Sequence, residues 1–325
     1  MKVLFITYPM AFHTPGGGEI QLLAYKKALE NKGVRVDLFN PWKPNFLDYD
    51  LVHYFSCVGG SVHICNFIRN LEIPLVITSS LWVTEETKHL YPVDEIRHQL
   101  SLADAIVANS DMEGDELARV FGLQREVFHT VYNGVEDDFF KNVDECYFRD
   151  EFKIYEEFVL NVGNIEPRKN QLNLVQAMKN YPDKKLVLIG HIRDAEYFEK
   201  IKNVATEGQL VYLGPLKHDS ILLRSAYSGA SVFCLPSTLE TPGLAALEAM
   251  ASGCKCIVTS EGSTKEYFGD HALYCQHDDI ESISACIGRI SEKNNVNYQS
   301  VSAVKSWAVA TNALIEIYEK VKKSN

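Results

Sequence analysis

The sequence predicts an α/β protein made of two doubly wound domains, and three observations support this fold class. Apolar runs of strand length alternate with amphipathic segments of helix length along nearly all of the 325 residues, a pattern typical of parallel sheets covered by helices on both faces. The alternation restarts after a stretch of lower apolar order at about 136–155. A chain of this length also exceeds what one hydrophobic core ordinarily supports.

The first half of the sequence predicts six strands separated by helices. Helices are expected at 19–33, near 60–70 and at 111–123, the first ending on Gly33 and the third N-capped by Asp111. The turn at Asn133-Gly134 closes this half. The expected strands are 2–7, 34–39, 50–55, 74–78, 103–110 and 127–131.

The second half repeats the pattern with five strands, at 157–163, 184–190, 209–214, 231–237 and 255–260, and with helices at 169–181, 195–205, 219–227 and 242–251. A last amphipathic helix, 306–323, lies beyond this set and must cover apolar surface. We expect domains at 1–145 and 146–305, with 306–325 packing back on the first. Ligands of open parallel sheets bind at the carboxyl ends of the strands, so we expect the site in a cleft that the two domains face.

Charge and hydropathy exclude several function classes. The net charge is −11, and residues 1–150 carry 13 basic against 22 acidic residues. An acidic chain without a basic block is a poor partner for nucleic acid, and its acidic half is unsuited to docking on anionic lipid. The sequence contains no run of 18 apolar residues, so we expect no membrane-spanning helix. The first residues have too short an apolar run to predict a secretory signal. We expect a cytoplasmic protein with at most peripheral contact at the inner face of the membrane.

Two patterns that point toward metals are better explained otherwise. The eight cysteines lie mostly in apolar segments and are expected to be buried, reduced thiols. Cys254 and Cys256 form a CxC, but no nearby Cys or His pair completes a ligand set. Asp48-Tyr49-Asp50 forms a DxD, yet it precedes a strand, at the end opposite to where ligands bind. We therefore expect no metal site and no cofactor.

Glycine-rich and basic loops supply the first two candidate sites. Gly16, Gly17 and Gly18 join the first strand to the first helix, where backbone N–H groups can approach an anion. They do not form GxGxxG, and a plain flexible turn is an equal alternative. Arg168 and Lys169 follow a strand at a helix start and suit a diphosphate. A solvated charge pair is the alternative for these two cations.

The stretch LPSTLETPGLAALEAMASGC, residues 235–254, is the third candidate. Its helix is expected to begin at Pro242 and Gly243, which directs free N–H groups toward a ligand. Glu248 lies within this apolar helix, and a buried carboxylate without partners costs several kcal/mol. The two hydroxyls of a ribose would suit it. A structural carboxylate bonded to local backbone or to an arginine is the alternative.

These residues resemble a known family. The spacing of Glu240 and Glu248 is similar to the donor-site signature of retaining glycosyltransferases of family four (glycosyl transferases group 1), which have the GT-B fold of two Rossmann-like domains. The resemblance extends in order along nearly the whole chain, and its basic motif is that of the EPRKN-type branch. The matching segments are GGGE, ADAIVANS, VYNGVEDDFF, VGNIEPRKN, PSTLETPGLAALEAMASG, EGSTKEYFGDHALY and SWAVATNALIEIY.

The resemblance implies a role for each matching residue. Glu248 binds the ribose, Glu240 faces the donor sugar, and Arg168 and Lys169 neutralise the diphosphate as it leaves. Backbone N–H groups between Thr241 and Leu244, a segment that includes Pro242 and Gly243, meet the sugar or diphosphate. Gly17 and Gly18 line the opposite side of the cleft.

Two positions depart from the family pattern. Many members carry an arginine directly after the strand glycine, where this chain has Asn164, and Arg168 is the nearest replacement. Many also carry a histidine in the loop after the fourth strand, near the donor sugar. This chain has Ser79 and Ser80 there, which bears on its contacts with the sugar and on its activity.

The resemblance implies transfer of a sugar from a UDP- or GDP-sugar, with retention, to a glycan, lipid-linked or other hydroxyl acceptor, in the synthesis of surface glycans. A non-catalytic or weakly active nucleotide-sugar-binding protein is the main alternative. A nucleotide-sugar epimerase or a phosphorylase on the same two-domain plan is a second. A nicotinamide oxidoreductase is disfavoured because the dinucleotide fingerprint is absent.

Overall fold

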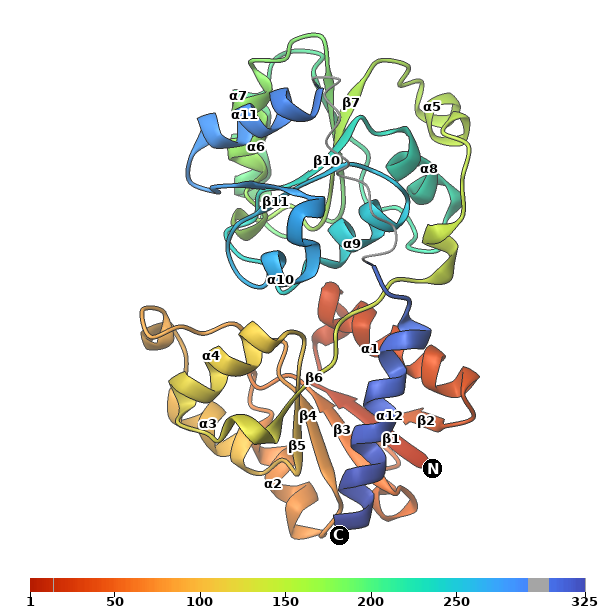
Figure 1. The fold of residues 1–325 in the computed structure, drawn as a ribbon, viewed down its shortest axis with the longest axis vertical. Helices are drawn as coiled ribbons and strands as arrows, with labels where there is room; N and C mark the ends of the chain where they lie inside the picture. The colour runs from red at the N-terminus through yellow and green to blue at the C-terminus, as the bar shows by residue number, and fades with distance from the viewer. Residues whose placement is uncertain (14, 292–303, 325) are drawn as a thin grey trace. The chain divides into compact units, whose positions relative to one another are not determined.

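The computed structural model describes residues 1–13, 15–291 and 304–324. The chain separates into two compact units (Figure 1). Unit 1 is Met1–Gly134 with Ser306–Asn325, and unit 2 is Val135–Lys305. Each unit contains one parallel sheet with helices on both faces, which confirms the predicted fold class.

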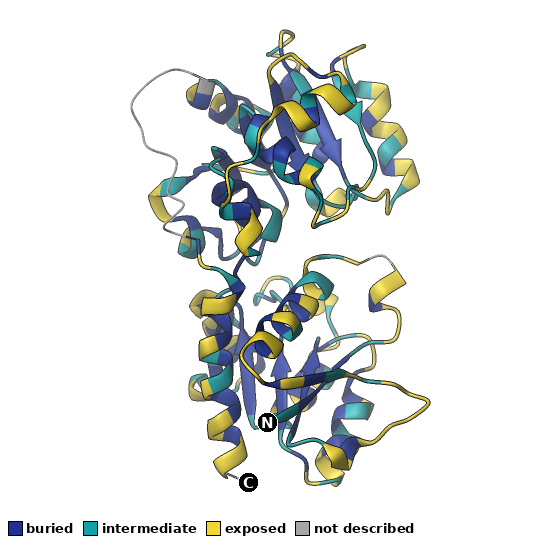
Figure 2. Ribbon diagram, turned by 90° about the vertical axis from the view of Figure 1, so that its right-hand side faces the viewer, coloured by how far each residue is buried: buried dark blue, intermediate teal, exposed yellow. Residues whose placement is uncertain are grey.

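Unit 1 contains the six expected strands in the order β2-β1-β3-β4-β5-β6, all parallel. β4 and β5 are buried along their whole length because helices cover both faces of the sheet. Figure 2 shows the strands of the sheets coloured mostly as buried. The strands are β1 (Lys2–Thr7), β2 (Arg35–Leu38), β3 (Leu51–Phe55), β4 (Leu75–Thr78), β5 (Ala105–Ala108) and β6 (Phe128–Thr130). The α-helices are α1 (Gly17–Asn31), α2 (Val62–Asn70), α3 (Val93–Ser101), α4 (Asp111–Phe121) and α12 (Trp307–Ser324), and the 3-10 helices are η1 (Ala11–His13), η2 (Phe46–Asp48), η3 (Lys88–Leu90) and η4 (Arg125–Val127).

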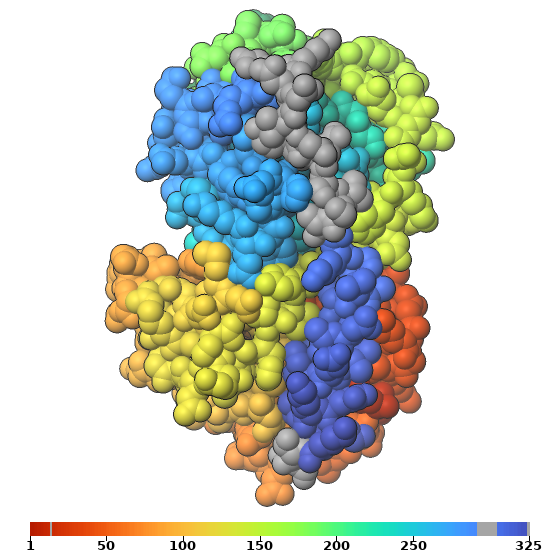
Figure 3. Space-filling view, in the orientation of Figure 1, coloured from red at the N-terminus to blue at the C-terminus, as the bar shows by residue number. Residues whose placement is uncertain are grey.

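Helix α12 returns to unit 1 and packs against α1, as predicted (Figure 3). The ring of Trp307 meets that of Tyr25 edge-on, with centroids 5.2 Å apart. Farther along the helix, Tyr318 Oη lies 2.5 Å from Nδ1 of His53 on β3. Nε2 of the same ring lies 2.7 Å from Thr78 Oγ1 on β4. The last helix is therefore part of the unit 1 core.

Unit 2 contains a second parallel sheet, in the order β12-β11-β10-β7-β8-β9. Its strands are β7 (Phe158–Val162), β8 (Lys185–Ile189), β9 (Leu210–Tyr212), β10 (Val232–Leu235), β11 (Cys256–Thr259) and β12 (Leu273–Cys275). Its α-helices are α5 (Cys146–Phe152), α6 (Gln171–Met178), α7 (Ala195–Val204), α8 (Ile221–Gly229), α9 (Leu244–Ala251), α10 (Thr264–Phe268) and α11 (Ile280–Ser291), and its 3-10 helices are η5 (Asp137–Phe140), η6 (Pro167–Lys169) and η7 (Gly269–His271).

Several local predictions were wrong or incomplete. The sequence did not predict β12, an edge strand of three residues, and the stretch 136–155 contains η5 and α5 rather than only a linker. The N-cap of α4 is Ser110, whose Oγ accepts a hydrogen bond from the N–H of Glu113 at 2.9 Å, and Asp111 is the first helical residue. Serine is as good an N-cap as aspartate, so residue type alone could not decide which of the two caps the helix.

The cysteines, the DxD and the helices also have defined places. All eight cysteines are unpaired, and seven are buried as predicted, but Cys146 is exposed at the start of α5.

Asp50 precedes β3, and its carboxylate accepts bonds from the N–H of Lys2 at 2.7 Å and from Lys322 Nζ at 2.8 Å. The Asp50 carboxylate is thus paired at the amino end of the unit 1 sheet. Among the described helices, none combines the length and the hydrophobicity needed to cross a membrane.

Candidate functional site

The basic loop after β7 is positioned by a close approach of two glycines. A Cβ built on Gly190, which follows β8, would lie 1.9 Å from the carbonyl oxygen of Gly163, which follows β7. Only glycine permits this approach, and it brings the loops after two neighbouring strands together at their carboxyl ends. The loop after Gly163 continues into η6, which carries Arg168 and Lys169. The N–H of Thr238, after β10, donates to the carbonyl of Arg168 at 2.9 Å.

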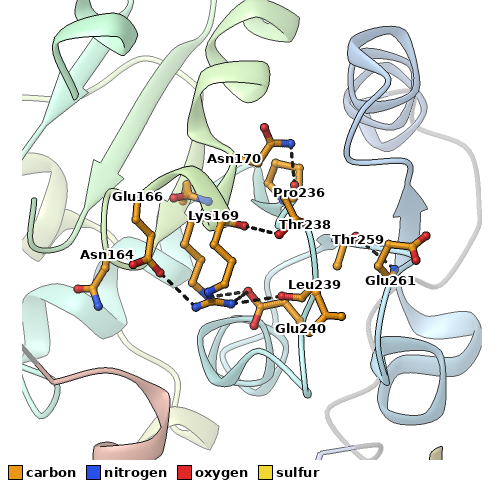
Figure 4. A network of polar contacts seen from close by, with 12 residues as sticks. Asn164, Glu166, Lys169, Asn170, Pro236, Thr238, Leu239, Glu240, Thr259 and Glu261 are labelled. Carbon is orange, nitrogen blue, oxygen red and sulfur yellow. Dashed lines mark hydrogen bonds and ion pairs between the residues drawn. The ribbon is translucent and has the colours of Figure 1, made fainter. Parts of the chain in front are cut away.

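Lys169 and Glu240 form an ion pair at the centre of this loop cluster (Figure 4). Lys169 Nζ lies 2.5 Å from Glu240 Oε1, and their side chains are 14% and 6% exposed. Arg168 Nη1 lies 3.7 Å from the same oxygen and 3.3 Å from the carbonyl of Leu239. Arg168 Nη2 also lies 3.2 Å from Glu166. The structure therefore brings three of the predicted residues together within unit 2.

Burial and charge act in opposite directions on this pair. Burial by itself raises the pKa of the Glu240 carboxyl, but the charges of Lys169 and Arg168 outweigh burial, so the pKa lies below its usual value. Burial lowers the pKa of Lys169, and the attraction of Glu240 offsets that effect only in part. Glu240 is thus ionised at neutral pH and already neutralises one of the two cations. An anionic ligand would have to share Lys169 with this carboxylate.

The amino end of α9 lies beside Glu240. The helix begins at Leu244 rather than at Pro242, because Gly243 adopts a left-handed conformation with φ 88° and serves as the N-cap. The N–H groups of Ala246 and Leu247 bond to the carbonyl of Gly243. The N–H groups of Gly243, Leu244 and Ala245 make no hydrogen bond with any described residue. They are free donors at the positive end of a helix.

The loop after β11 holds the backbone of Glu240 in place. Glu240 and Gly262 form a parallel β-bridge, and the N–H of Ser263 donates to the carbonyl of Glu240 at 3.0 Å. A Cβ on Gly262 would lie 2.1 Å from that carbonyl oxygen, and its φ is +86°. A Cβ on Gly243 would lie 3.3 Å from Glu240 Oε2. Cations, free N–H groups and one carboxylate therefore converge on a small volume suited to an anionic group.

Glu248 lies inside α9 and is 6% exposed. Its Oε1 lies 2.7 Å from His218 Nε2, and its Oε2 accepts a hydrogen bond from Tyr227 Oη at 3.0 Å. These partners differ from the backbone or arginine considered from the sequence. His218 follows β9, so its place at a strand's carboxyl end could have marked it, whereas nothing in the sequence singles out Tyr227.

Asn164 faces a cation that was missed from the sequence. With its amide turned to satisfy both of its polar groups, Asn164 Oδ1 accepts hydrogen bonds from Arg193 Nε at 2.9 Å and from Nη2 at 3.1 Å. Arg193 Nη1 also lies 3.3 Å from Glu166. Arg193 follows β8, and this position at a strand's carboxyl end was the available signal. A second arginine, and thus a third cation, therefore lies at the carboxyl ends of the unit 2 strands.

In unit 1, Gly17 and Gly18 form the first turn of α1, with Gly16 as the N-cap. The carboxylate of Glu19 accepts a hydrogen bond from the N–H of Gly16 at 2.6 Å. A Cβ built on Gly18 would meet no atom of a described residue within 4 Å, so this turn is open on that side toward the part of the chain that the structure describes. The two glycines thus lie in a different unit from the other candidate residues.

Ser79, which is buried, and Ser80, which is exposed, belong to a polar network at the carboxyl ends of the unit 1 strands. Ser79 Oγ donates to Glu113 Oε1 at 2.5 Å, and Ser80 Oγ donates to Gln21 Oε1 at 3.2 Å. Gln21 Nε2 in turn donates to Asn109 Oδ1 at 2.7 Å. Burial raises the pKa of Glu113 to about 7. The two serines are therefore held by neighbours that the sequence did not single out.

No group of three or more His, Cys, Asp or Glu side chains within 1–13, 15–291 and 304–324 is arranged to hold a metal ion. The polar groups that converge at Glu240 are instead cations and N–H donors, which attract anions.

Sequence comparison places two family models on the chain. The model described as "Glycosyl transferases group 1" matches residues 148–306, and the one described as "Glycosyltransferase Family 4" matches residues 43–139. O-antigen chain mannosyltransferase B of Escherichia coli is 25% identical over 254 residues, covering 70% of this chain and 66% of the relative. Mannosylfructose-phosphate synthase of Agrobacterium fabrum is 22% identical, covering 74% and 60%. The chain thus spans about two thirds of the length of these relatives or less.

Solved structures show the same fold. Sucrose-phosphate synthase from Thermosynechococcus elongatus superimposes with a TM-score of 0.81 at 19% identity, over 100% of this chain and 99% of that one. Anabaena Alr3699/HepE in complex with UDP-glucose gives a TM-score of 0.76 at 18% identity, with coverage of 100% and 99%.

Proposed function

Because the chain belongs to glycosyltransferase family 4, whose two family models match residues 43–139 and 148–306, we propose that it is a retaining glycosyltransferase. It moves a sugar from a nucleotide-diphosphate sugar to a hydroxyl acceptor. The observation that carries this proposal is the convergence of Lys169, Arg168 and the free N–H groups of α9 beside Glu240. The donor's diphosphate binds there, in unit 2.

The chemistry follows from where charge develops. As the bond between the sugar's anomeric carbon and the phosphate oxygen breaks, the ring gains positive charge and the departing phosphate gains negative charge. Lys169, Arg168 and the amino end of α9 stabilise the negative part, and they do so more strongly in the transition state than in the ground state. Glu240 faces the sugar ring, where its carboxylate favours the positive charge.

Retention follows if the acceptor attacks the face from which the phosphate leaves. The acceptor oxygen forms the new bond to the anomeric carbon, and its proton passes to the departing phosphate oxygen. No separate general base is then needed. The donor supplies the diphosphate, and the proposal includes no metal ion.

The donor is proposed to be a UDP- or GDP-sugar and the acceptor a glycan or lipid-linked hydroxyl. Anabaena Alr3699/HepE, which shares the fold, was solved with UDP and with UDP-glucose. An O-antigen mannosyltransferase is among the relatives, which supports a role in surface polysaccharide synthesis. We propose that this synthesis takes place in the cytoplasm, with at most peripheral contact at the membrane.

A thermal-shift screen with UDP, GDP, ADP and their sugars tests the donor. A ligand that binds only the folded protein, at about one hundred times its dissociation constant, raises the free energy of unfolding by about 2.7 kcal/mol. The proposal expects one nucleotide class to stabilise the protein and NAD(H) to have no effect. Product analysis then separates the possible reactions. A transferase gives a glycosylated acceptor, hydrolysis gives free sugar, and a phosphorylase gives a sugar phosphate.

Two variants test the site directly. Lys169→Ala removes the buried cation and Glu248→Ala removes the ribose acceptor, and each is expected to lower transfer by at least about a hundredfold. Lys202→Ala is the control, because Lys202 lies on the surface of α7, where its ammonium group pairs with Glu199 and lies over the ring of Phe198. Near-native turnover in either site variant would contradict the assignment.

A non-catalytic nucleotide-sugar-binding protein is the second candidate, and one observation favours it. Where many family members carry a histidine, this chain has Ser79 or Ser80, and their hydroxyl groups donate to Glu113 and to Gln21 respectively. This candidate expects stabilisation by a nucleotide sugar with no transfer to any acceptor and no loss of the donor over time.

A further inference from the structure

Glu248 holds two bonds before any ligand arrives. His218 reaches it from the loop between β9 and α8, and Tyr227 reaches it from α8 itself. Each carboxylate oxygen has two acceptor positions, so one remains on each oxygen after these bonds form. The two protein donors fix the orientation of the carboxylate within α9. The remaining acceptor positions therefore point in defined directions.

The surroundings of His218 favour its charged form. The charged groups that face His218 among the described residues are Glu248 on α9, Glu136 at the start of η5 and Asp219 next to it in the chain. Burial alone would lower the pKa of His218, but the hydrogen bond and charge of Glu248 outweigh it, and the pKa is raised above its usual 6.5. The ring also lies against Phe139, with centroids 5.4 Å apart.

We propose, on the premise of the function proposed above, that His218 is a positioning residue for the nucleotide donor: it orients the Glu248 carboxylate toward the pentose hydroxyls, and its positive charge makes donor affinity depend on pH. Tyr227 shares the orienting role but not the charge, because burial raises the pKa of its phenol well above the usual range and keeps it neutral.

The sign of the pH dependence follows from the charges. While His218 is protonated, its charge offsets that of Glu248, and the anionic donor meets a nearly neutral pair. Once His218 loses its proton, Nε2–H can still donate to Glu248, but the site has one more net negative charge. Donor binding therefore weakens as pH rises through the folded-state pKa of His218, which lies above 6.5.

The first experiment measures the affinity of UDP-glucose and GDP-mannose by calorimetry between about pH 6 and about pH 8.5. Nucleotide sugars are used because their diphosphate does not titrate in this range, whereas that of a free nucleoside diphosphate does. The wild type is expected to lose about five- to tenfold in affinity over the range, as for one unit charge several ångströms from an anion. A flat profile in the wild type would overturn the inference.

Two variants separate charge from orientation. His218→Gln keeps a donor toward Glu248 but cannot be protonated, so its affinity is expected to be nearly constant over the range and close to that of the wild type at high pH. Tyr227→Phe removes one orienting bond and no charge, so its affinity is expected to fall at every pH while the wild-type slope is kept. An unchanged slope in His218→Gln would overturn the proposed role.

A second measurement needs no ligand. The proton spectrum of the His218 ring, followed over the same pH range, is expected to give a pKa above 6.5 that falls in Glu248→Gln. A pKa that is unaffected by Glu248→Gln would refute the coupling even if donors bind. Intact coupling together with no binding of any nucleotide sugar would instead overturn the proposed function, and with it the donor role of His218.

Discussion

Glu113 is a fully buried carboxyl group whose protonation changes near neutral pH. Its Oε1 accepts bonds from Ser79 Oγ and from the N–H of Leu81, and its Oε2 accepts one from the N–H of Asn109. Despite these bonds, burial raises its pKa from 4.5 to about 7. When Glu113 is protonated, its O–H group can donate a hydrogen bond to Ser79 Oγ. The Ser79 hydroxyl then donates to the carbonyl of Val107, 3.3 Å away.

The raised pKa of Glu113 predicts that unit 1 loses stability as pH rises. Below about pH 4.5 the group is protonated in both the folded and unfolded states, so it causes no pH dependence. Between about 4.5 and about 7 the unfolded state releases its proton first, so the free energy of unfolding falls, by on the order of 3 kcal/mol in total, and then levels off. Urea unfolding monitored by hydrogen exchange in unit 1 measures this change.

Glu113→Gln is expected to remove most of that decline, because an amide does not titrate and can donate to Ser79 in place of the protonated acid. Glu126→Gln is the control, since Glu126 is an exposed glutamate in unit 1. A decline that persists in Glu113→Gln would show that other groups cause it.

At the residue scale, the sequence identified charges but not their partners. The apolar run around Glu248 implies that its carboxylate needs partners, because an unpaired buried charge is costly. The actual partners, His218 and Tyr227, lie 30 and 21 positions away in the chain. Such pairings depend on how α8 packs beside α9, and no local pattern encodes them. The same is true of Ser79 and Glu113, which are 34 positions apart.

At the element scale, the loops after the strands determine the site more than the strands do. Long apolar runs predicted eleven of the twelve strands that the described residues form, because burial on both faces leaves few alternatives. β12, with three residues, and β9, whose residues are only half-buried, carry weaker signals, and β12 was missed. The start of α9 was placed too early because the left-handed conformation of Gly243 cannot be read from its residue type alone.

Gly262→Ala tests how far the loop after β11 holds Glu240. A Cβ at Gly262 would lie 2.1 Å from the carbonyl oxygen of Glu240, so the loop must move and Glu240 with it. We expect a loss of stability of about 2 kcal/mol or more, together with weaker donor binding. Gly253→Ala is the matched control, because Gly253 also has a positive φ, of 79°, but among the described residues no atom would lie within 4 Å of its Cβ.

The control is expected to lose about 1 kcal/mol through backbone strain alone and to bind the donor normally. Equal affinity in the two variants, measured by calorimetry with the same nucleotide sugar, would mean that the position of Glu240 does not depend on this contact.

At the scale of the whole molecule, the chain leaves unit 1, forms unit 2 and returns to complete unit 1 with α12. The sequence predicted this return from the amphipathic pattern of 306–323 and from the family resemblance. It did not predict the buried contact through which α12 joins the core. His53 is fully buried on β3, and burial lowers its pKa to about 3, so its ring is neutral. One ring nitrogen bonds to Tyr318 and the other to Thr78.

Tyr318→Phe is therefore expected to destabilise unit 1 and leave unit 2 unchanged. The variant removes the hydroxyl that pairs with His53 Nδ1, and an unpaired buried polar atom costs about 1–3 kcal/mol. Hydrogen exchange resolves the two units, which a single melting temperature does not, because a two-domain chain need not unfold in one step. Protection of β3, β4 and α12 is expected to fall, while that of β7 and β10 stays constant.

The control lies on the same helix. Asn312 Oδ1 accepts an exposed hydrogen bond from Lys32 at 2.7 Å, so Asn312→Ala is expected to change stability by no more than about 0.5 kcal/mol. Adding the nucleotide sugar should raise protection in unit 2 by the same amount in the wild type and in Tyr318→Phe, because the proposed diphosphate and ribose contacts all belong to unit 2. A ligand effect that is lost in Tyr318→Phe would show instead that donor binding requires an intact unit 1.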